Sequence, residues 1–397
     1  MPGRIYYNTI ISVSIIFISV AISSCASGPY FRPPSGFVLN YNLHKKNLFL
    51  FTELQDKFAF DCIQLNEEEG VLYVKTGKSI IQKLEVGMEK LPKLLEENDL
   101  SKIDLDFIKK ISYNRNKNLL YAVSNSNLYA LDADSLKVSE KIAFSDDSIK
   151  RVAISGNGDN LLLGNINNLT LLNQETLKEI STIAIDLPIV DIVEQNHKAY
   201  ALSRSNDNKI CRLTALNIDD DGNLSITKEY LLSSSAHSNL DMSGDGKWLI
   251  IGGHPLTIID IKSGVIKYEI PSIEAHFASS AKFSKDNKYI ILSGYQPYIN
   301  VLKFPELTPV FSTPFSERLD SYLAIPIFPQ LAISDNFIYA IGAYGVTNAP
   351  SGDIITKHLT AINAVDHKKS FVSVSAAGTG YKKFWGPAIA ILSAKFE

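Results

Sequence analysis

The residues that could do chemistry in this chain are few and scattered. None of the seven histidines is paired with another at a spacing that suits a metal ion. These are His44, His197, His237, His254, His276, His358 and His367. The sequence also lacks a Gly-x-Ser-x-Gly nucleophile elbow, a phosphate-binding Gly-x-x-x-x-Gly-Lys loop, a His-Glu-x-x-His pair and a Cys-x-x-Cys pair. We therefore expect no metal, no cofactor and no catalytic residue, and we favour a function other than catalysis.

One acidic segment has the spacing of half a calcium-binding loop. Residues Asn217–Asn223 place oxygen donors at alternate positions, and Gly222 stands at the sixth. The twelfth position is Lys228, where a calcium loop requires a glutamate. A hairpin that turns at Asp221-Gly222 accounts for the same residues, so we predict a turn here.

The N-terminus has the layout of a secretory signal over residues 1–24. Arg4 precedes an apolar run, Ile10–Ile22, whose 13 residues fall short of the roughly 20 that a membrane-spanning helix needs. The tetrapeptide Ile22-Ser23-Ser24-Cys25 resembles the lipobox of bacterial lipoproteins. That resemblance implies cleavage before Cys25, lipidation of its thiol and attachment to a membrane of the cell envelope. By the same resemblance, the residue after the cysteine, Ala26 in place of an aspartate, implies the outer membrane. An ordinary secretory signal and an uncleaved anchor are the alternatives.

Composition and charge set limits on the rest of the chain. A formal net charge of -3 gives no electrostatic footprint for nucleic acid, so we expect no nucleic-acid partner. A hydrophobic content of 45% is enough for a large core. Residues 25–36 combine the lipidated cysteine with a tether rich in proline and glycine, and residues 37–397 form the body. We expect Cys62 and Cys211 to be small buried residues; one long-range disulfide is the alternative.

Internal repetition predicts the fold of the body. One pattern of four short apolar strands separated by polar turns recurs along the chain. The copies begin near Ile63, Ile111, Val152, Asp191, Leu240, Ala281 and Leu331, which are 48, 41, 39, 49, 41 and 50 residues apart. This spacing suits a four-stranded propeller blade of roughly 40 to 50 residues. We therefore predict an all-β fold, a single β-propeller of seven four-stranded blades, with eight blades as the alternative.

Two segments outside these copies carry further expectations. Residues 37–60 and 383–396 have strand-like sequences, and we expect the two ends of the chain to share one sheet. Residues 88–100 have leucines at helical spacing, so we expect a helix there, with Pro92 in its first turn.

Some of the repeats resemble those of known propellers. Residues 243–253, followed by Ile259–Gly264, are similar to the repeats of WD40-like and YVTN-type propellers: a serine–x–aspartate–glycine turn, a strand, and an aspartate before a glycine turn. Residues 129–134 look like the third strand of quinoprotein-type repeats. The clear resemblance covers three or four repeats and implies a propeller.

The connections between second and third strands combine aromatic and polar residues, as protein-binding surfaces do. From them we take four candidate partner-binding residues: His254, Tyr295, Tyr298 and Tyr344. We therefore predict an envelope lipoprotein that serves as a non-catalytic platform for an envelope protein partner. One alternative is a lactonase-like hydrolase, because residues 216–224 resemble a turn of lactonase-type propellers. Another is a propeller that binds a small molecule in its central channel.

Overall fold

The computed structural model describes residues 41–50, 62–76, 79–87, 90–103, 107–124, 126–143, 153–155, 161–233, 238–271, 278–294, 298–314, 317–319, 322–335, 337–347 and 384–396. The expectations for the signal, for Cys25, for the tether and for Tyr295 lie outside these residues. No helix in the described part of the chain has the length and apolar character needed to cross a membrane.

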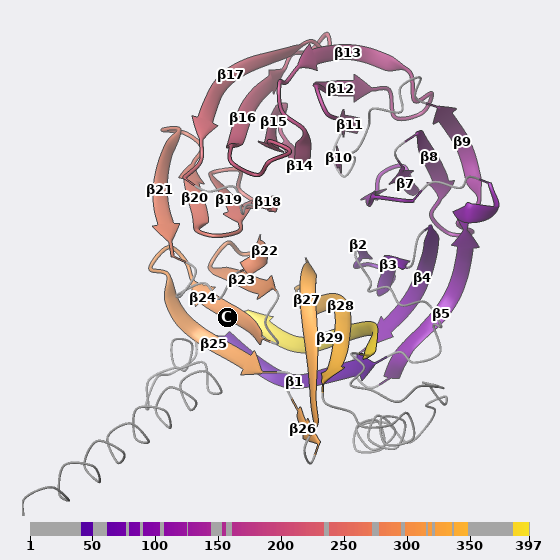
Figure 1. The fold of residues 1–397 in the computed structure, drawn as a ribbon, viewed down its shortest axis with the longest axis vertical. Helices are drawn as coiled ribbons and strands as arrows, with labels where there is room; N and C mark the ends of the chain where they lie inside the picture. Colours follow the sequence, from indigo (N-terminus) through magenta and orange to yellow (C-terminus); the bar gives the residue numbers. More distant parts are fainter. Residues whose placement is uncertain are drawn as a thin grey trace, which may run out of the picture.

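The described strands form a β-propeller, a ring of sheets arranged around one axis (Figure 1). Six sheets have four antiparallel strands each, and in each one the strands follow chain order from the axis outward. We call these six sheets blades 1 to 6.

Blade 1 consists of β2 (Cys62–Asn66), β3 (Val71–Thr76), β4 (Ile80–Gly87) and β5 (Lys90–Asp99). Blade 2 consists of β6 (Lys110–Asn114), β7 (Leu119–Val123), β8 (Asn127–Asp132) and β9 (Val138–Ala143). Blade 3 consists of β10 (Ala153–Ser155), β11 (Leu161–Gly164), β12 (Asn168–Leu172) and β13 (Glu179–Ala184).

Blade 4 consists of β14 (Ile189–Gln195), β15 (Lys198–Arg204), β16 (Cys211–Ile218) and β17 (Leu224–Leu231). Blade 5 consists of β18 (Asn239–Met242), β19 (Trp248–Gly252), β20 (Leu256–Asp260) and β21 (Val265–Ile270). Blade 6 consists of β22 (Ala278–Phe283), β23 (Tyr289–Gly294), β24 (Tyr298–Lys303) and β25 (Thr308–Pro314).

The remaining sheet joins the two ends of the chain. It contains β26 (Glu317–Leu319), β27 (Tyr322–Ile333), β28 (Phe337–Thr347), β29 (Phe384–Phe396) and β1 (Tyr41–Leu50), in the order β1-β29-β28-β27-β26. The pairing of β1 with β29 confirms that the ends share a sheet. The prediction of seven four-stranded blades is corrected: six blades have four strands, and the closing sheet has five. The ends complete that sheet and form no eighth blade in the described part of the chain.

The predicted copies of the repeat coincide with these sheets. The starts Ile63, Ile111, Asp191, Leu240, Ala281 and Leu331 lie in β2, β6, β14, β18, β22 and β27, and Val152 directly precedes β10. In all six blades the pairing of third and fourth strands contains a register shift. Such bulges increase the local twist of the outer strands.

The expected helix over residues 88–100 is wrong. The segment forms β5, the outermost strand of blade 1, and only a short 3-10 turn, η2 (Leu100–Lys102), follows it. Pro92 is tolerated because an outermost strand pairs along one edge only. Leu94 and Leu95, whose spacing suggested a helix face, are 49% and 38% exposed. Both leucines lie exposed in an outermost strand, so their spacing does not mark a buried helix face.

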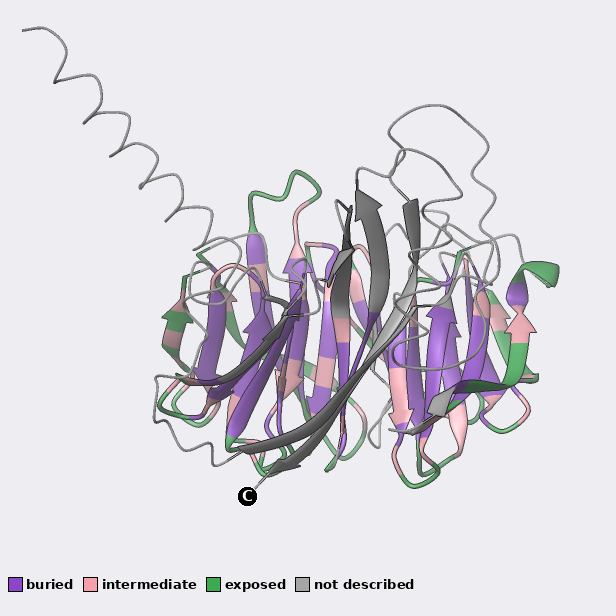
Figure 2. Ribbon diagram, turned by 90° about the horizontal axis from the view of Figure 1, so that it is seen from below, coloured by how far each residue is buried: buried purple, intermediate pink, exposed green. Residues whose placement is uncertain are grey.

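The core lies between the blades. The inner and middle strands are largely buried and the outer strands largely exposed, as Figure 2 shows. Tyr121 and Leu128 of blade 2 pack against Leu161 and Leu172 of blade 3. Burial on both faces of a four-stranded sheet requires a neighbour on each side, which a closed ring provides.

The same kind of packing closes the ring between its first and last sheets. Tyr339 and Ile341 of the closing sheet pack against Ile63 and Leu72 of blade 1.

Both described cysteines are buried and neither forms a disulfide, as predicted. Cys62 is 7% exposed and Cys211 1% exposed. Burial raises the pKa of the Cys211 thiol to about 11. Both act as small core residues.

Candidate functional site

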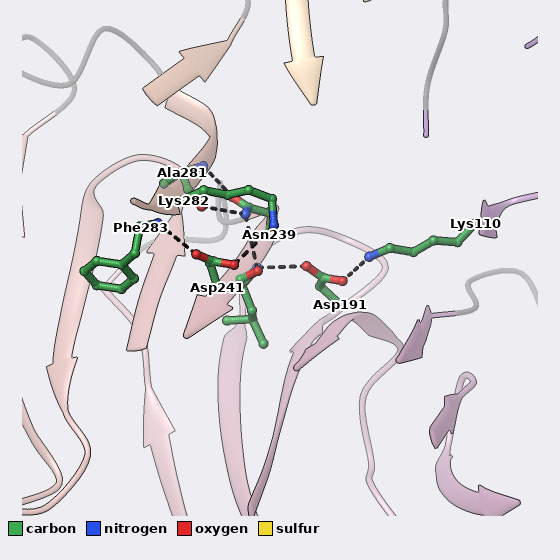
Figure 3. A network of polar contacts seen from close by, with 8 residues as sticks. Lys110, Asp191, Asn239, Asp241, Ala281, Lys282 and Phe283 are labelled. Carbon is green, nitrogen blue, oxygen red and sulfur yellow. Dashed lines mark hydrogen bonds and ion pairs between the residues drawn. The ribbon is translucent and has the colours of Figure 1, made fainter. Parts of the chain in front are cut away.

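The first strands of the blades line the axis of the ring and carry a network of polar contacts between blades (Figure 3). Each first strand pairs with the second strand of its own blade along one edge only. Its other edge therefore leaves backbone groups that need partners. Side chains from the preceding blade supply those partners at several junctions.

Asp191 on β14 joins three blades. One carboxylate oxygen accepts the backbone N–H of Leu240 in blade 5, at 2.8 Å. The other carboxylate oxygen is ion-paired with Lys110 of blade 2. The Asp191 side chain is only 8% exposed, and a buried carboxylate is tolerated only with such partners. Lys110 belongs to blade 2 and Asp191 to blade 4, so this ion pair joins two blades that are not adjacent in the ring (Figure 3).

Asn239 on β18 clamps the next first strand. Its amide oxygen accepts the N–H of Ala281, and its amide nitrogen donates to the Ala281 carbonyl, both at 3.1 Å. Gly252, its cross-strand neighbour on β19, leaves the room that this side chain occupies. A Cβ on Gly252 would lie 1.8 Å from the Asn239 amide oxygen.

Asp241, two residues further along β18, repeats the arrangement. It accepts the N–H of Phe283 at 2.8 Å and pairs with Lys282 at 3.2 Å. Burial raises the pKa of the Asp241 carboxyl, although Lys282 opposes that shift. The Asp241 carboxylate in turn raises the pKa of Lys282. Because Asp191 and Asp241 each face a lysine, the network is a set of compensated charges that joins blades.

The turns between first and second strands and between third and fourth strands share one rim, because the strands are antiparallel. We call this the turn rim. Lys117 of blade 2 pairs with Glu175 of blade 3 at 2.6 Å. Between blades 5 and 6 the backbone N–H of Gly244 donates to Asn287 at 2.7 Å. The turns thus bond adjacent blades to one another.

Glu67 lies where the turn rim closes. It accepts the backbone N–H of Asp335, in the closing sheet, at 2.8 Å, and it pairs with Lys285 of blade 6. Partial burial alone would raise its pKa. The hydrogen bonds from Lys285 and Asp335 and the charges of Lys285 and Arg115 outweigh this and hold the pKa of Glu67 below its ordinary value.

The opposite rim carries the connections between second and third strands, and we call it the loop rim. His254 is half-buried in the connection between β19 and β20, and Tyr298 is the first residue of β24. The expectation that Tyr344 lies in a connection is wrong, because it lies within β28, paired with Pro326 and Gly386. Partner binding by these residues stays a prediction.

The acidic segment Asn217–Asn223 forms a hairpin turn between β16 and β17, as expected. The Asp219 carboxylate accepts the backbone N–H groups of Asp221 and Asn223, at 3.1 and 2.7 Å. Gly222 has a φ of +81°, a conformation that favours glycine. The described residues contain no group of three or more His, Cys, Asp or Glu arranged to hold a metal ion.

Reasoning from the sequence missed the axial network. The available signal was a charged residue inside an apolar first strand: Asp191 stands in the run Ile189-Val190-Asp191-Ile192-Val193. A carboxylate at such a position requires a buried partner. The identity of that partner depends on ring geometry, because Lys110 is 81 residues away along the chain.

Ring closure, blade order and interblade packing together define this protein as a β-propeller. No protein-family model matches the chain, and no curated protein matches its sequence. Among solved structures, the chain is similar to BamB from Moraxella catarrhalis, with a TM-score of 0.48 and 13% sequence identity over 70% of this chain and 80% of that one. The assignment to the propeller class rests on the strand order and not on this likeness.

Proposed function

We propose that this protein is a lipid-anchored component of the bacterial cell envelope whose propeller binds a protein partner through its loop rim. The observation that carries the proposal is a difference between the two rims. At several junctions the turn rim is occupied by bonds between blades, such as Lys117 with Glu175 and Glu67 with Lys285. The loop rim gathers six connections, one from each four-stranded blade, on one side of the ring.

The anchor is supported by the sequence. The apolar run Ile10–Ile22 and the tetrapeptide ending in Cys25 have the order of a lipoprotein signal. Two acyl chains give stable attachment where one is marginal. The proline- and glycine-rich residues 26–36 then act as a spacer between membrane and propeller.

The anchor is tested by Cys25→Ser. We expect the variant to leave the membrane fraction or to accumulate with its signal uncleaved. Membrane fractionation and the mass of the N-terminal peptide measure both effects. Normal cleavage together with full membrane retention would refute lipid attachment at Cys25.

The platform is tested separately, by crosslinking the protein to its neighbours in native membranes. We expect the double variant Tyr295→Ala with Tyr298→Ala to reduce capture of the crosslinked partner about tenfold or more, because truncating one aromatic hot-spot residue costs about 2 kcal/mol or more and about 1.4 kcal/mol is a factor of ten. The control is Lys288→Ala, an exposed residue of the turn rim whose ion pair stays within its own turn.

Three outcomes would count against the platform. Capture that survives the double variant would remove these tyrosines from the interface. A large loss of thermal stability would show that they pack between blades. Hydrolysis of a lactone by the double variant would favour the enzyme alternative over a binding platform.

A further inference from the structure

A pocket of about 330 Å³ opens at the junction of blades 4 and 5, on the turn rim. One wall is the face of blade 4 that looks toward blade 5. The other wall is the hairpin turn between β20 and β21. The pocket is lined by Lys198, Tyr200, Ala215, Leu216, Asn217, Thr227, Lys228, Tyr230 and residues 261–264. Its volume lies within the range of small-molecule sites, about 300–1,000 Å³.

Strand periodicity explains why these residues meet. Lys198 and Tyr200 are two positions apart on β15 and so share a face, as do Lys228 and Tyr230 on β17. In the register, Ala215 pairs with both Tyr200 and Lys228. A bulge between β16 and β17 leaves Thr227 unpaired, and such bulges re-aim the side chains beside them.

The charge of the pocket is unbalanced. Three lysines line it, Lys198, Lys228 and Lys262, and its lining contains no carboxylate. Within the described parts of the chain, none of the three forms an ion pair. Lys228 donates to the Gly264 carbonyl at 2.6 Å, which uses one of its three donors.

The equivalent turns of other blades show how the excess of positive charge in this pocket arises. The third-to-fourth-strand turns of blades 2, 3 and 5 begin with Asp132, Asn173 and Asp260, whose side chains each accept a backbone N–H three residues on. Two residues after that start stand Asp134, Glu175 and Lys262.

The charge at this position differs between the blades. In blades 2 and 3 the carboxylate pairs with a lysine of the preceding blade: Asp134 with Lys83 at 2.9 Å, and Glu175 with Lys117 at 2.6 Å. In blade 5 the position holds Lys262, which faces further lysines of blade 4 across the pocket. Like charges brought together without a counter-ion repel one another, so an external anion would stabilise the junction.

The rest of the lining suits an apolar body attached to that anion. Tyr200 and Tyr230 present aromatic rings, and Leu216 and Ile261 add aliphatic surface. Lys228 lies over the Tyr230 ring, 4.8 Å from its centroid. Burial, with a smaller contribution from Tyr230, raises the pKa of Tyr200 to about 12, and burial also raises the pKa of Tyr230. A tyrosine hydroxyl is protonated at neutral pH even at its ordinary pKa of 10, so both hydroxyls carry a proton that they can donate.

We propose that this pocket binds a phosphate monoester joined to an apolar or aromatic group. Lys198, Lys228 and Lys262 contact the phosphate, since lysines bind phosphate as point charges. The tyrosine rings contact the apolar group. The same chemistry occurs in soluble organic phosphates and in the headgroup of phosphatidic acid, and separate probes distinguish the two.

The soluble probe is phenyl phosphate, titrated by calorimetry into the purified propeller. We expect saturable binding that weakens with salt and is stronger than for inorganic phosphate or phenol. The double variant Lys198→Ala with Lys262→Ala should raise the Kd about tenfold or more. The matched control, Lys137→Ala with Lys178→Ala, removes the same charge from exposed positions in the turns of blades 2 and 3 and should leave the Kd unchanged.

The lipid probe is a vesicle of phosphatidylcholine with or without phosphatidic acid, assayed by co-sedimentation. Binding of phenyl phosphate alone assigns the site to a soluble ligand, and vesicle binding that depends on Lys198 and Lys262 assigns it to a lipid. The proposal is overturned if neither probe binds, or if the control variant weakens binding as much as the pocket variant does. Thermal denaturation of both variants verifies that they fold.

Discussion

The Gly252→Ala substitution tests whether the Asn239 clamp holds blades 5 and 6 together. A methyl group on Gly252 would stand 1.8 Å from the Asn239 amide oxygen, far inside contact distance, and 3.1 Å from the Ala281 nitrogen. Gly252 carries no unusual backbone conformation, because its φ lies outside the left-handed range. Any destabilisation therefore comes from the clash and not from backbone strain.

The magnitude follows from the groups that lose their partners. To relieve the clash, the Asn239 amide must turn away from Ala281, which leaves the buried N–H and carbonyl of Ala281 without their hydrogen bonds. An unsatisfied buried polar group costs about 1–3 kcal/mol. Replacing glycine by alanine in a strand returns roughly 0.5–1 kcal/mol. With two such groups, we therefore expect Gly252→Ala to lower the free energy of unfolding by about 1–5 kcal/mol.

Urea denaturation of the soluble propeller measures this change, with Gly244→Ala as the matched control. Gly244 lies in an exposed turn of the same blade, and a methyl group on it would have its nearest neighbouring atom 3.5 Å away, at ordinary contact distance. We expect the control to change stability by less than about 0.5 kcal/mol.

A double-mutant cycle separates the clamp from other effects. In an Asn239→Ala background the amide group that clashes with the new methyl is gone. Gly252→Ala should then lower the free energy of unfolding by at least ~1 kcal/mol less than it does in the wild type. Additive effects of the two substitutions would refute the clamp. So would a Gly252→Ala protein as stable as the Gly244→Ala control.

The remaining predictions concern closure of the ring. Because the pKa of Glu67 is lowered in the folded state, its contribution to stability is present above its ordinary pKa of 4.5 and is lost as the pH falls through the lowered value. Glu67→Gln should therefore lower the free energy of unfolding by about 1 kcal/mol near neutral pH, a value reduced because Glu67 is partly exposed. The urea midpoints of the variant and the wild type should converge in acid, and a difference that stays constant with pH would contradict this. Removal of blade 6, residues 278–314, should expose the apolar face of blade 5 around Ile250 and Ile258 and cause aggregation, measured by size-exclusion chromatography. A soluble, monomeric product would contradict a closed ring.

The repeat period predicted the propeller because burial repeats with the blade. Apolar first strands such as the one at Leu240 recur because every blade must cover its neighbour, and this requirement is local and periodic. The shared sheet of β1 and β29 was predictable for the same reason, since strand-like residues at both ends need a common partner.

The errors arise where position in the ring decides the outcome. Residues 88–100 look helical in isolation, but β4 offers them an edge to pair with, and tertiary pairing overrides local pattern. The prediction for Tyr344 fails because β28 is longer than the other second strands and extends past this residue. The ion pair of Lys110 with Asp191 depends on the diameter of the ring, a property that no short segment encodes.

In a repeat fold, equivalent turns show which features the fold requires and which can vary between blades. The third-to-fourth-strand turns of blades 2, 3 and 5 keep the same backbone: Leu136, Leu177 and Gly264 occupy equivalent positions with φ of +52°, +54° and +62°. That geometry is needed to reverse the chain whatever the charge of the turn. The change from Asp134 and Glu175 to Lys262 leaves the side-chain-to-backbone hydrogen bond of the turn in place. It does remove the counter-charge for lysines of the preceding blade. Because the fold does not require this change, we attribute the lysine at this position to the binding of a ligand. The junction of blades 4 and 5 is open to an external phosphate, whereas the junctions of blades 1 with 2 and 2 with 3 supply their own carboxylates.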